Sequence, residues 1–367
     1  MEKIIRGSMP SREIIYLWTR YVLGNPEDLT SQFLQGDTDP RTLILRVLAT
    51  AEHTAKGMTA DDIVGFLEAS FGSFIQRRRV SSWNSDNSAL ANSLRELSTH
   101  KVVESDNGGF YHLTPLGNLS GVSGIEVESI IRIVDGLAGL SSMAISDPTL
   151  LAACQLTAEL DQVLFPINKK SSQKEPQAWF GQLRNQAVPE SVLYALQRRV
   201  QTKYEPTLRA KKTVACLPWI SGRSMAEIED TLTQFGGRFD GAAGPMRSVR
   251  ARTCDLLPTV AKVAELLNPG LDLSPRVHRL LMRLELGIPS DAVSLAIFTN
   301  DRLSRGDYLA LSRAGLCDFA KIVTADDDPL LSKVGGHKNK LAELRKAVAQ
   351  HEKVQQGIVA SVPPYIP

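Results

Sequence analysis

The segment RLSRGDYLALSRAGLCDFAKIVTADDDPLLSKV, residues 302–334, decides the fold of the C-terminal part of this 367-residue chain. Apolar residues at helical spacing predict a short helix that Gly315 ends, and a second short helix follows it. A third helical run opens at Pro329 and ends at Gly335 and Gly336. This order is typical of tandem helix-hairpin-helix units, which can present backbone N–H groups at helix N-termini to a phosphate.

Composition narrows the class of protein. Apolar residues make up 43% of the chain and charged residues 22%, as in ordinary globular proteins. The net charge is +2, so any basic surface for nucleic acid must be local. Four dispersed cysteines and six histidines show no metal-ligand spacing, which favours a reduced, cytoplasmic protein without a metal site. No apolar run approaches about 18 residues, and no signal-peptide core is present, so we expect no membrane partner.

Upstream, helical periodicity over about 40–51, 59–71 and 88–100 precedes two short β-prone runs. Asn107 and Gly108 between these runs indicate a tight hairpin. Three helices followed by a hairpin predict a winged helix. The basic run at 77–79 could then bind phosphate, or it could be a solvated turn or a contact to a neighbouring domain.

Three motifs occur in a specific order along the chain. A wing of the form Y-x-x-T-x-L-G is spelled by Tyr111, Thr114, Leu116 and Gly117. The stretch 217–229 contains W-I-x-G and then I-E, and a Gly-Pro-Met-Arg run at 244–247 opens a long helical pattern. With this order the chain resembles the C-terminal half of the Ski-like branch of superfamily-2 DExH helicases. The resemblance covers residues 11–348.

The resemblance implies a mainly α fold with a small β-wing. The implied domains are an N-terminal helical segment leading from a motor domain outside this chain (1–36), a winged helix (37–120), a helical ratchet-like domain (121–285), a helix-hairpin-helix domain (286–350) and a tail (351–367).

The chain contains no G-x-x-x-x-G-K-[ST] loop and no D-E-x-H motif. ATP hydrolysis needs a phosphate-cradling loop, a lysine and a Mg²⁺ carboxylate together. We therefore expect no ATPase activity and no cofactor in this chain. ATP and Mg²⁺ are implied only for a motor that joins it in cis or in trans.

In the family, the long helix lies along the translocating strand, and here Pro245 begins it with Arg247 and Arg250 on one face. These arginines could track phosphates, or they could form surface ion pairs. Asp255 stands near the position where repair members of the family carry a base-stacking aromatic residue, and Pro258 predicts a kink. Other candidate nucleic-acid-binding residues are Arg209, Lys211, Lys212, Arg276, Arg279, Arg305, Arg313, Gly335, Gly336 and Lys338.

The sequence therefore predicts the part of a Ski-like helicase that grips single-stranded DNA or RNA. The winged helix is expected to pack mostly on the motor. Two alternatives stay open: a stand-alone winged-helix regulator that reads duplex sequence, and a scaffold subunit of a helicase complex without a nucleic-acid role. The sequence does not distinguish DNA from RNA.

Overall fold

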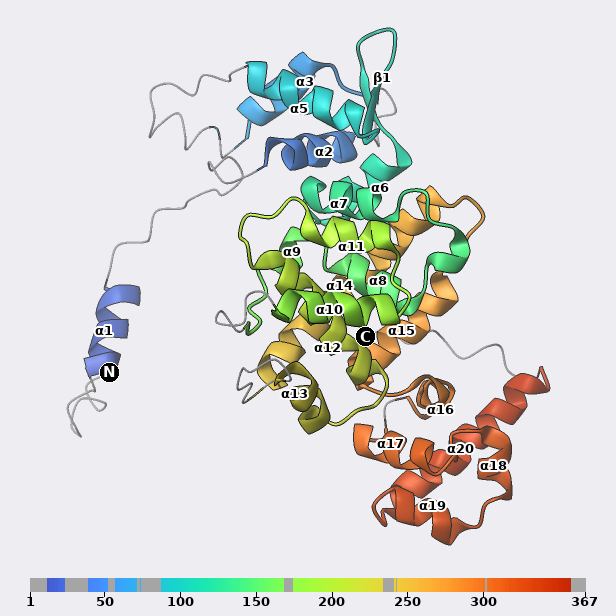
Figure 1. The fold of residues 1–367 in the computed structure, drawn as a ribbon. Coiled ribbons are helices and arrows are strands. Elements are labelled where there is room, and N and C mark those ends of the chain that lie inside the picture. The colour runs from blue at the N-terminus through green and yellow to red at the C-terminus, as the bar shows by residue number, and fades with distance from the viewer. Residues whose placement is uncertain are drawn as a thin grey trace.

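The computed structural model describes residues 12–23, 39–51, 57–70, 73, 87–167, 174–233, 241, 243–300 and 302–357. Across these residues the chain is mainly α, as predicted, with one two-stranded antiparallel sheet. Figure 1 shows an N-terminal group of helices at one end, a central helical body, and a C-terminal group at the other end. The basic run at 77–79 lies outside the described residues.

The N-terminal group contains the sheet. Its elements are α2 (Pro40–Ala51), α3 (Ala60–Glu68), α5 (Asn87–Thr99), β1 (Val103–Ser105) and β2 (Tyr111–Leu113), and helix α1 (Arg12–Tyr21) precedes it in the chain. Helix α2 packs against α3, α5 and β2. The strands pair with Val103 opposite Leu113. The Asp106 carboxylate accepts hydrogen bonds from the N–H groups of Gly108 and Phe110, both at 2.9 Å, which fixes the predicted turn.

The motif after β2 has a packing reason. Thr114 caps the next helix, and its hydroxyl accepts from the Gly117 N–H at 3.1 Å. The same hydroxyl donates to Lys101 O at 2.8 Å. A Cβ on Gly117 would stand 1.9 Å from Val102 O, so only glycine fits here. The motif therefore joins the hairpin to the central body.

The central body surrounds the long helix α14. Its other elements are α6 (Pro115–Ser123), α7 (Val127–Leu137), η2 (Ser142–Ala144), α8 (Asp147–Cys154), α9 (Ala158–Asp161), α10 (Lys174–Asn185), α11 (Glu190–Gln197), α12 (Glu205–Ile220), α13 (Met225–Thr233) and α15 (Ser274–Leu286). Helix α14 (Ala243–Leu267) is continuous through Pro258 and packs against α6, α7, α8, α12 and α15. Its buried face includes Leu256, Leu257 and Val260.

The C-terminal group has its own core. It consists of η4 (Ser290–Ala292), α16 (Val293–Thr299), α17 (Arg305–Arg313), α18 (Phe319–Thr324), α19 (Asp327–Lys333) and α20 (Lys338–Gln355). Helix α20 packs against α16, α18 and α19. The His351 ring stacks on Phe319 at 4.0 Å between centroids, and Phe298 contacts both edge-on. Three hydrophobic cores are centred on these groups; the N-terminal core also takes in Val127 and Ile131 of α7, and the C-terminal core takes in Met282 of α15.

None of the helices in the described ranges combines the length and the apolar character that crossing a membrane requires.

Candidate nucleic-acid interface

Trp219 stands where the central body meets the C-terminal group. It belongs to the last turn of α12, and its indole N–H donates to Leu284 O at 2.7 Å. Gly287 caps α15 in the left-handed region, with φ of 66°, and lies against the Trp219 ring. A side chain at Gly287 would collide with this ring, so the sequence leaves the space open. The indole is therefore held rigidly, with its face turned to cations.

Two guanidinium groups approach the Trp219 ring. The Arg305 Cζ atom lies 4.3 Å from the ring centroid, and the Arg250 Cζ atom lies 5.5 Å from it. Arg305 is the first residue of α17, and Ser304 and Asp307 form a capping box there. Cation–π contact and the fixed indole hold both charges in place.

The acceptors of these guanidinium groups are backbone carbonyls. Arg305 donates to Gly287 O at 2.9 Å and to Arg223 O at 2.6 Å. Arg250 donates to Glu285 O at 2.9 Å. Burial lowers the pKa of Arg305 below its ordinary value, and the nearby charges of Arg313 and Arg250 lower it further. The charges of Arg250, Arg305 and Arg313 thus lie close enough to act on one another.

Two further arginines, Arg247 and Arg313, extend the group. Arg247 and Arg313 are exposed, and Arg250 is half-buried. Among the residues that the structure describes, no ion pair joins Arg247, Arg250, Arg305 or Arg313 to a carboxylate. Arg252, on the same helix, instead pairs with Asp255 at 3.4 Å. We call Trp219 with Arg247, Arg250, Arg305 and Arg313 the arginine cluster.

Three predicted residues do not reach the surface. Arg209 is fully buried and donates to Asp161 at 2.8 and 2.5 Å and to the carbonyls that end α11. Lys211 is buried against Glu175 at 2.6 Å, and Lys212 donates to Leu160 O. This corrects the expectation that these three side chains contact a strand. Their charged groups bind partners inside the fold, because a buried cation without a partner is energetically costly.

Two more predicted arginines act as ties between segments. Arg276 donates to Ile145 O and lies 3.8 Å from Asp147. Arg279 is exposed and donates to Ser290 O at 3.0 Å. The structure does not bring either residue to Trp219. The next arginine on this face, Arg283, pairs with Asp147, so the predicted basic face of α15 is partly neutralised.

The predicted glycine pair forms an exposed turn between α19 and α20. Gly335 and Gly336 have φ of 69° and 75°, and the Gly336 N–H donates to Leu331 O at 2.9 Å, which ends α19. Lys338 is exposed on the first turn of α20. Lys340, two residues on, pairs with Asp307 at 2.7 Å. This contact ties the start of α20 to the helix that carries Arg305.

The exposed side chains of α5 give no basic surface. Those that the structure describes are Ala91, Asn92, Arg95, Glu96, Ser98 and Thr99. Arg95 donates to Asn92 at 2.9 Å. One arginine and one glutamate leave this face with no net charge, unlike the phosphate-facing helix of a duplex reader.

Sequence reasoning did not include Trp219 among the candidate site residues. The W-I-x-G motif at 219–222 carried the signal, since it marks the turn after α12. No group of three His, Cys, Asp or Glu side chains within the described ranges could hold a metal ion.

A comparison with models of known protein families finds no match. A comparison with curated proteins finds no relative.

Proposed function

We propose that this chain is the part of a Ski-like helicase that grips single-stranded nucleic acid, with the arginine cluster as the phosphate contact. The observation that carries the proposal is the approach of Arg250 and Arg305 to Trp219. Arg313 lies close enough to Arg305 to lower its pKa, and Arg247 shares a face of α14 with Arg250. The acceptors of Arg250 and Arg305 are carbonyl oxygens, and within the described ranges no carboxylate pairs with any of the four arginines. Guanidinium groups suit the phosphate geometry, and an uncancelled group of them favours an anionic partner.

The helical arrangement supports the finer fold that we propose. Helices α2, α3 and α5 with the β1–β2 hairpin would be the winged helix, and α14 would be the ratchet helix. The consecutive short helices α16 to α19, with the longer α20 after them, would be the helix-hairpin-helix domain. The three hydrophobic cores follow these proposed domains only in part, because Val127 and Ile131 of α7 belong to the N-terminal core and Met282 of α15 belongs to the C-terminal core.

A single strand suits the cluster better than a duplex. Arg247 and Arg250 lie on one face of α14, and Arg305 and Arg313 come from α17. The two arginines that approach the indole come from separate helices, and we propose that one phosphate backbone passes along them. The neutral face of α5 favours a winged helix that packs on the motor. ATP and Mg²⁺ belong to that motor, which we place outside this chain in a cytoplasmic assembly.

The test changes Arg247→Ala and Arg250→Ala together. Binding of a labelled single-stranded oligonucleotide should weaken, and its salt dependence should flatten. Each phosphate contact contributes about −0.7 to the slope of log K against log salt on single strands. Loss of two contacts should therefore flatten the slope by about 1.4 units.

A matched control removes the same charge elsewhere. Arg252→Ala with Arg184→Ala takes away two arginines that are paired with Asp255 and Glu190. This variant should keep the wild-type slope. If both double variants flattened the slope of log K against log salt equally, only net charge would matter. That outcome would refute the assignment of the arginine cluster.

A further inference from the structure

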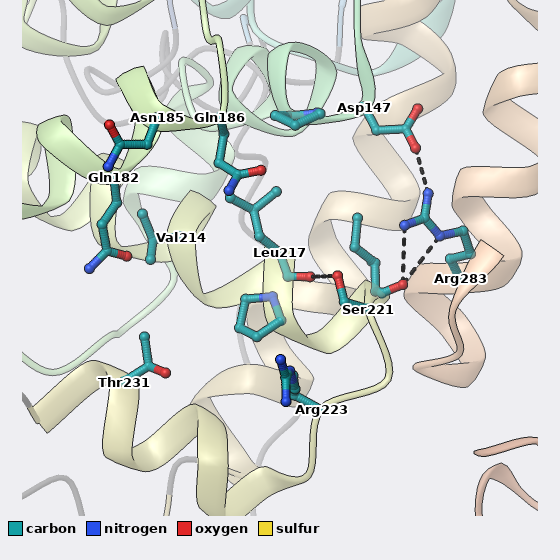
Figure 2. A pocket seen from close by; sticks show the side chains of 13 residues that line it. Asp147, Gln182, Asn185, Gln186, Val214, Leu217, Ser221, Arg223, Thr231 and Arg283 are labelled. Atoms are coloured by element: carbon teal, nitrogen blue, oxygen red, sulfur yellow. Dashed lines mark hydrogen bonds and ion pairs between the residues drawn. The ribbon is translucent and has the colours of Figure 1, made fainter. Parts of the chain in front are cut away.

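A hollow of about 450 Å³ opens in the central body beside the arginine cluster. Its walls come from α8, α10, α12, α13 and α15 (Figure 2). Three carboxamide side chains line one side, and all three belong to α10 or the residue that follows it: Gln182, Asn185 and Gln186. The floor is apolar and is formed in part by Val214, Leu217 and Pro218.

The carboxamides are open to a ligand, because Asn185 and Gln186 are exposed and Gln182 is half-buried. No hydrogen bond joins the side chains of Gln182, Asn185 or Gln186 to another described residue. Because they are three and four residues apart on a helix, they share one face. Figure 2 shows them together on one side of the hollow. Each supplies both N–H donors and a carbonyl acceptor.

The polar groups on the opposite wall of the hollow already have hydrogen-bond partners inside the fold. Arg283 pairs with Asp147 and donates to Ile220 O at 3.2 Å from both Nε and Nη2. The Ser221 hydroxyl donates to Leu217 O at 2.9 Å. These groups are saturated by internal hydrogen bonds, so they shape the hollow. Recognition falls to the carboxamides and to Arg223.

Arg223 connects the hollow to the arginine cluster. Its guanidinium lines the hollow, with 64% of the side chain exposed, and pairs with Glu227 at 3.0 Å. Its carbonyl oxygen accepts from Arg305 at 2.6 Å. A strand whose phosphate lies on Arg305 therefore passes the mouth of the hollow. An apolar floor with donor and acceptor groups at its rim matches a nucleobase, which has an apolar face and a polar edge.

We propose that this hollow holds one unstacked nucleobase of the bound strand, with its edge on the carboxamides of α10 and its face on Leu217 and Pro218. The inference rests on the proposed function, because the strand is positioned by the arginine cluster. Carboxamides can meet the edge of every base, so the hollow would act as a register point along the strand.

The experiment combines base deletion with side-chain deletion. A short single-stranded oligonucleotide carries one abasic position, which is moved along its length, and affinity is measured by fluorescence anisotropy. For the wild-type chain, one position should lower affinity about tenfold, the size expected for losing one base contact. In Gln182→Ala with Gln186→Ala, the intact oligonucleotide should bind more weakly, and that position should have little further effect.

A matched control removes two exposed carboxamides that do not line the hollow, Gln162→Ala with Gln201→Ala. It should keep the wild-type pattern. If the abasic position and the double variant lowered affinity independently and additively, the inference would be overturned. The proposal that the chain binds a strand would still stand. A free nucleoside monophosphate that binds and is lost in the double variant, with no sensitive abasic position, would show a mononucleotide site and also overturn it. Absence of any oligonucleotide binding would refute the proposed function itself.

Discussion

Replacing Gly287 by alanine should loosen the arginine cluster. Gly287 ends α15 with φ of 66°, and its carbonyl oxygen accepts from Arg305 at 2.9 Å. A Cβ built at this position would lie 2.5 Å from Trp219 Cζ2 and 2.5 Å from Arg305 Nε. Neither group can move freely, because the indole also donates to Leu284 O and Arg305 also donates to Arg223 O.

The expected loss has two parts. A non-glycine residue in the left-handed region costs roughly 1–2 kcal/mol. Forcing a methyl group into a packed site typically costs about 1–3 kcal/mol more. Gly287→Ala should therefore lower the free energy of unfolding by about 2–5 kcal/mol. Strand affinity should fall as well, because Arg305 and Trp219 can no longer hold their present positions.

Gly124 provides the matched control. It also ends a helix in the left-handed region, with φ of 71°, but a Cβ there meets nothing within 4 Å. Gly124→Ala should lose only the backbone part, about 1–2 kcal/mol, and should keep strand affinity. Urea denaturation with unchanged m values gives both losses. Equal losses for the two variants would refute the close packing of Trp219 and Arg305 around Gly287.

Two further predictions concern buried charge in the central body. Burial chiefly lowers the pKa of Lys212, from 10.5 to about 8. The folded state thus binds this proton more weakly than the unfolded state, and the resulting destabilisation is complete below pH 8 and fades as pH rises toward 10.5. Lys212→Met should remove this pH dependence. The free energy of unfolding of the variant, relative to that of the wild type, should therefore fall by about 2 kcal/mol between pH 7 and 9.5. Parallel plots of this free energy against pH for the two proteins would contradict the prediction. Asp161→Asn should lower stability by about 3–5 kcal/mol, because the fully buried Arg209 loses its nearer ionic partner and keeps only Glu205 at 3.7 Å. A change in urea midpoint no larger than that of Asp255→Asn, at an exposed pair, would contradict it.

Local signals in the sequence predicted local structure well. Helix stops at Gly315 and at the Gly335 turn follow from backbone preferences that act within a few residues. The hairpin also forms where the sequence predicted it, although Gly109, with φ of 78°, and not Asn107 or Gly108, takes the left-handed conformation. The Y-x-x-T-x-L-G motif also reflects nearby contacts, because Thr114 and Gly117 meet the chain just before β1. These features needed no knowledge of the tertiary fold.

Side-chain environments could not be predicted in the same way. Lys211 and Lys212 follow Arg209 in a basic run that looks exposed, but their partners Glu175, Leu160 and Asp161 lie 36 to 52 residues away in sequence. At Trp219 the opposite holds, because the sequence gives no sign of the arginines that approach it in the fold. Its arginines come from α14 and α17, so the tertiary fold alone brings them together.

The chain is nearly neutral overall, but its basic residues occur in two different electrostatic settings. In the central body, Arg132 and Arg209 share Asp161, and Arg41, Arg132 and Arg199 converge on Glu128. Such ion pairs hold helices together. Because the paired charges cancel, they leave little electrostatic field at the protein surface. At Trp219 the arginines meet carbonyl dipoles and an indole, which hold a guanidinium in position without neutralising it. Positioned but uncancelled charge is what a phosphate backbone requires, so a search for such sites should rank arginines by the charge of their partners and not by their density in the sequence.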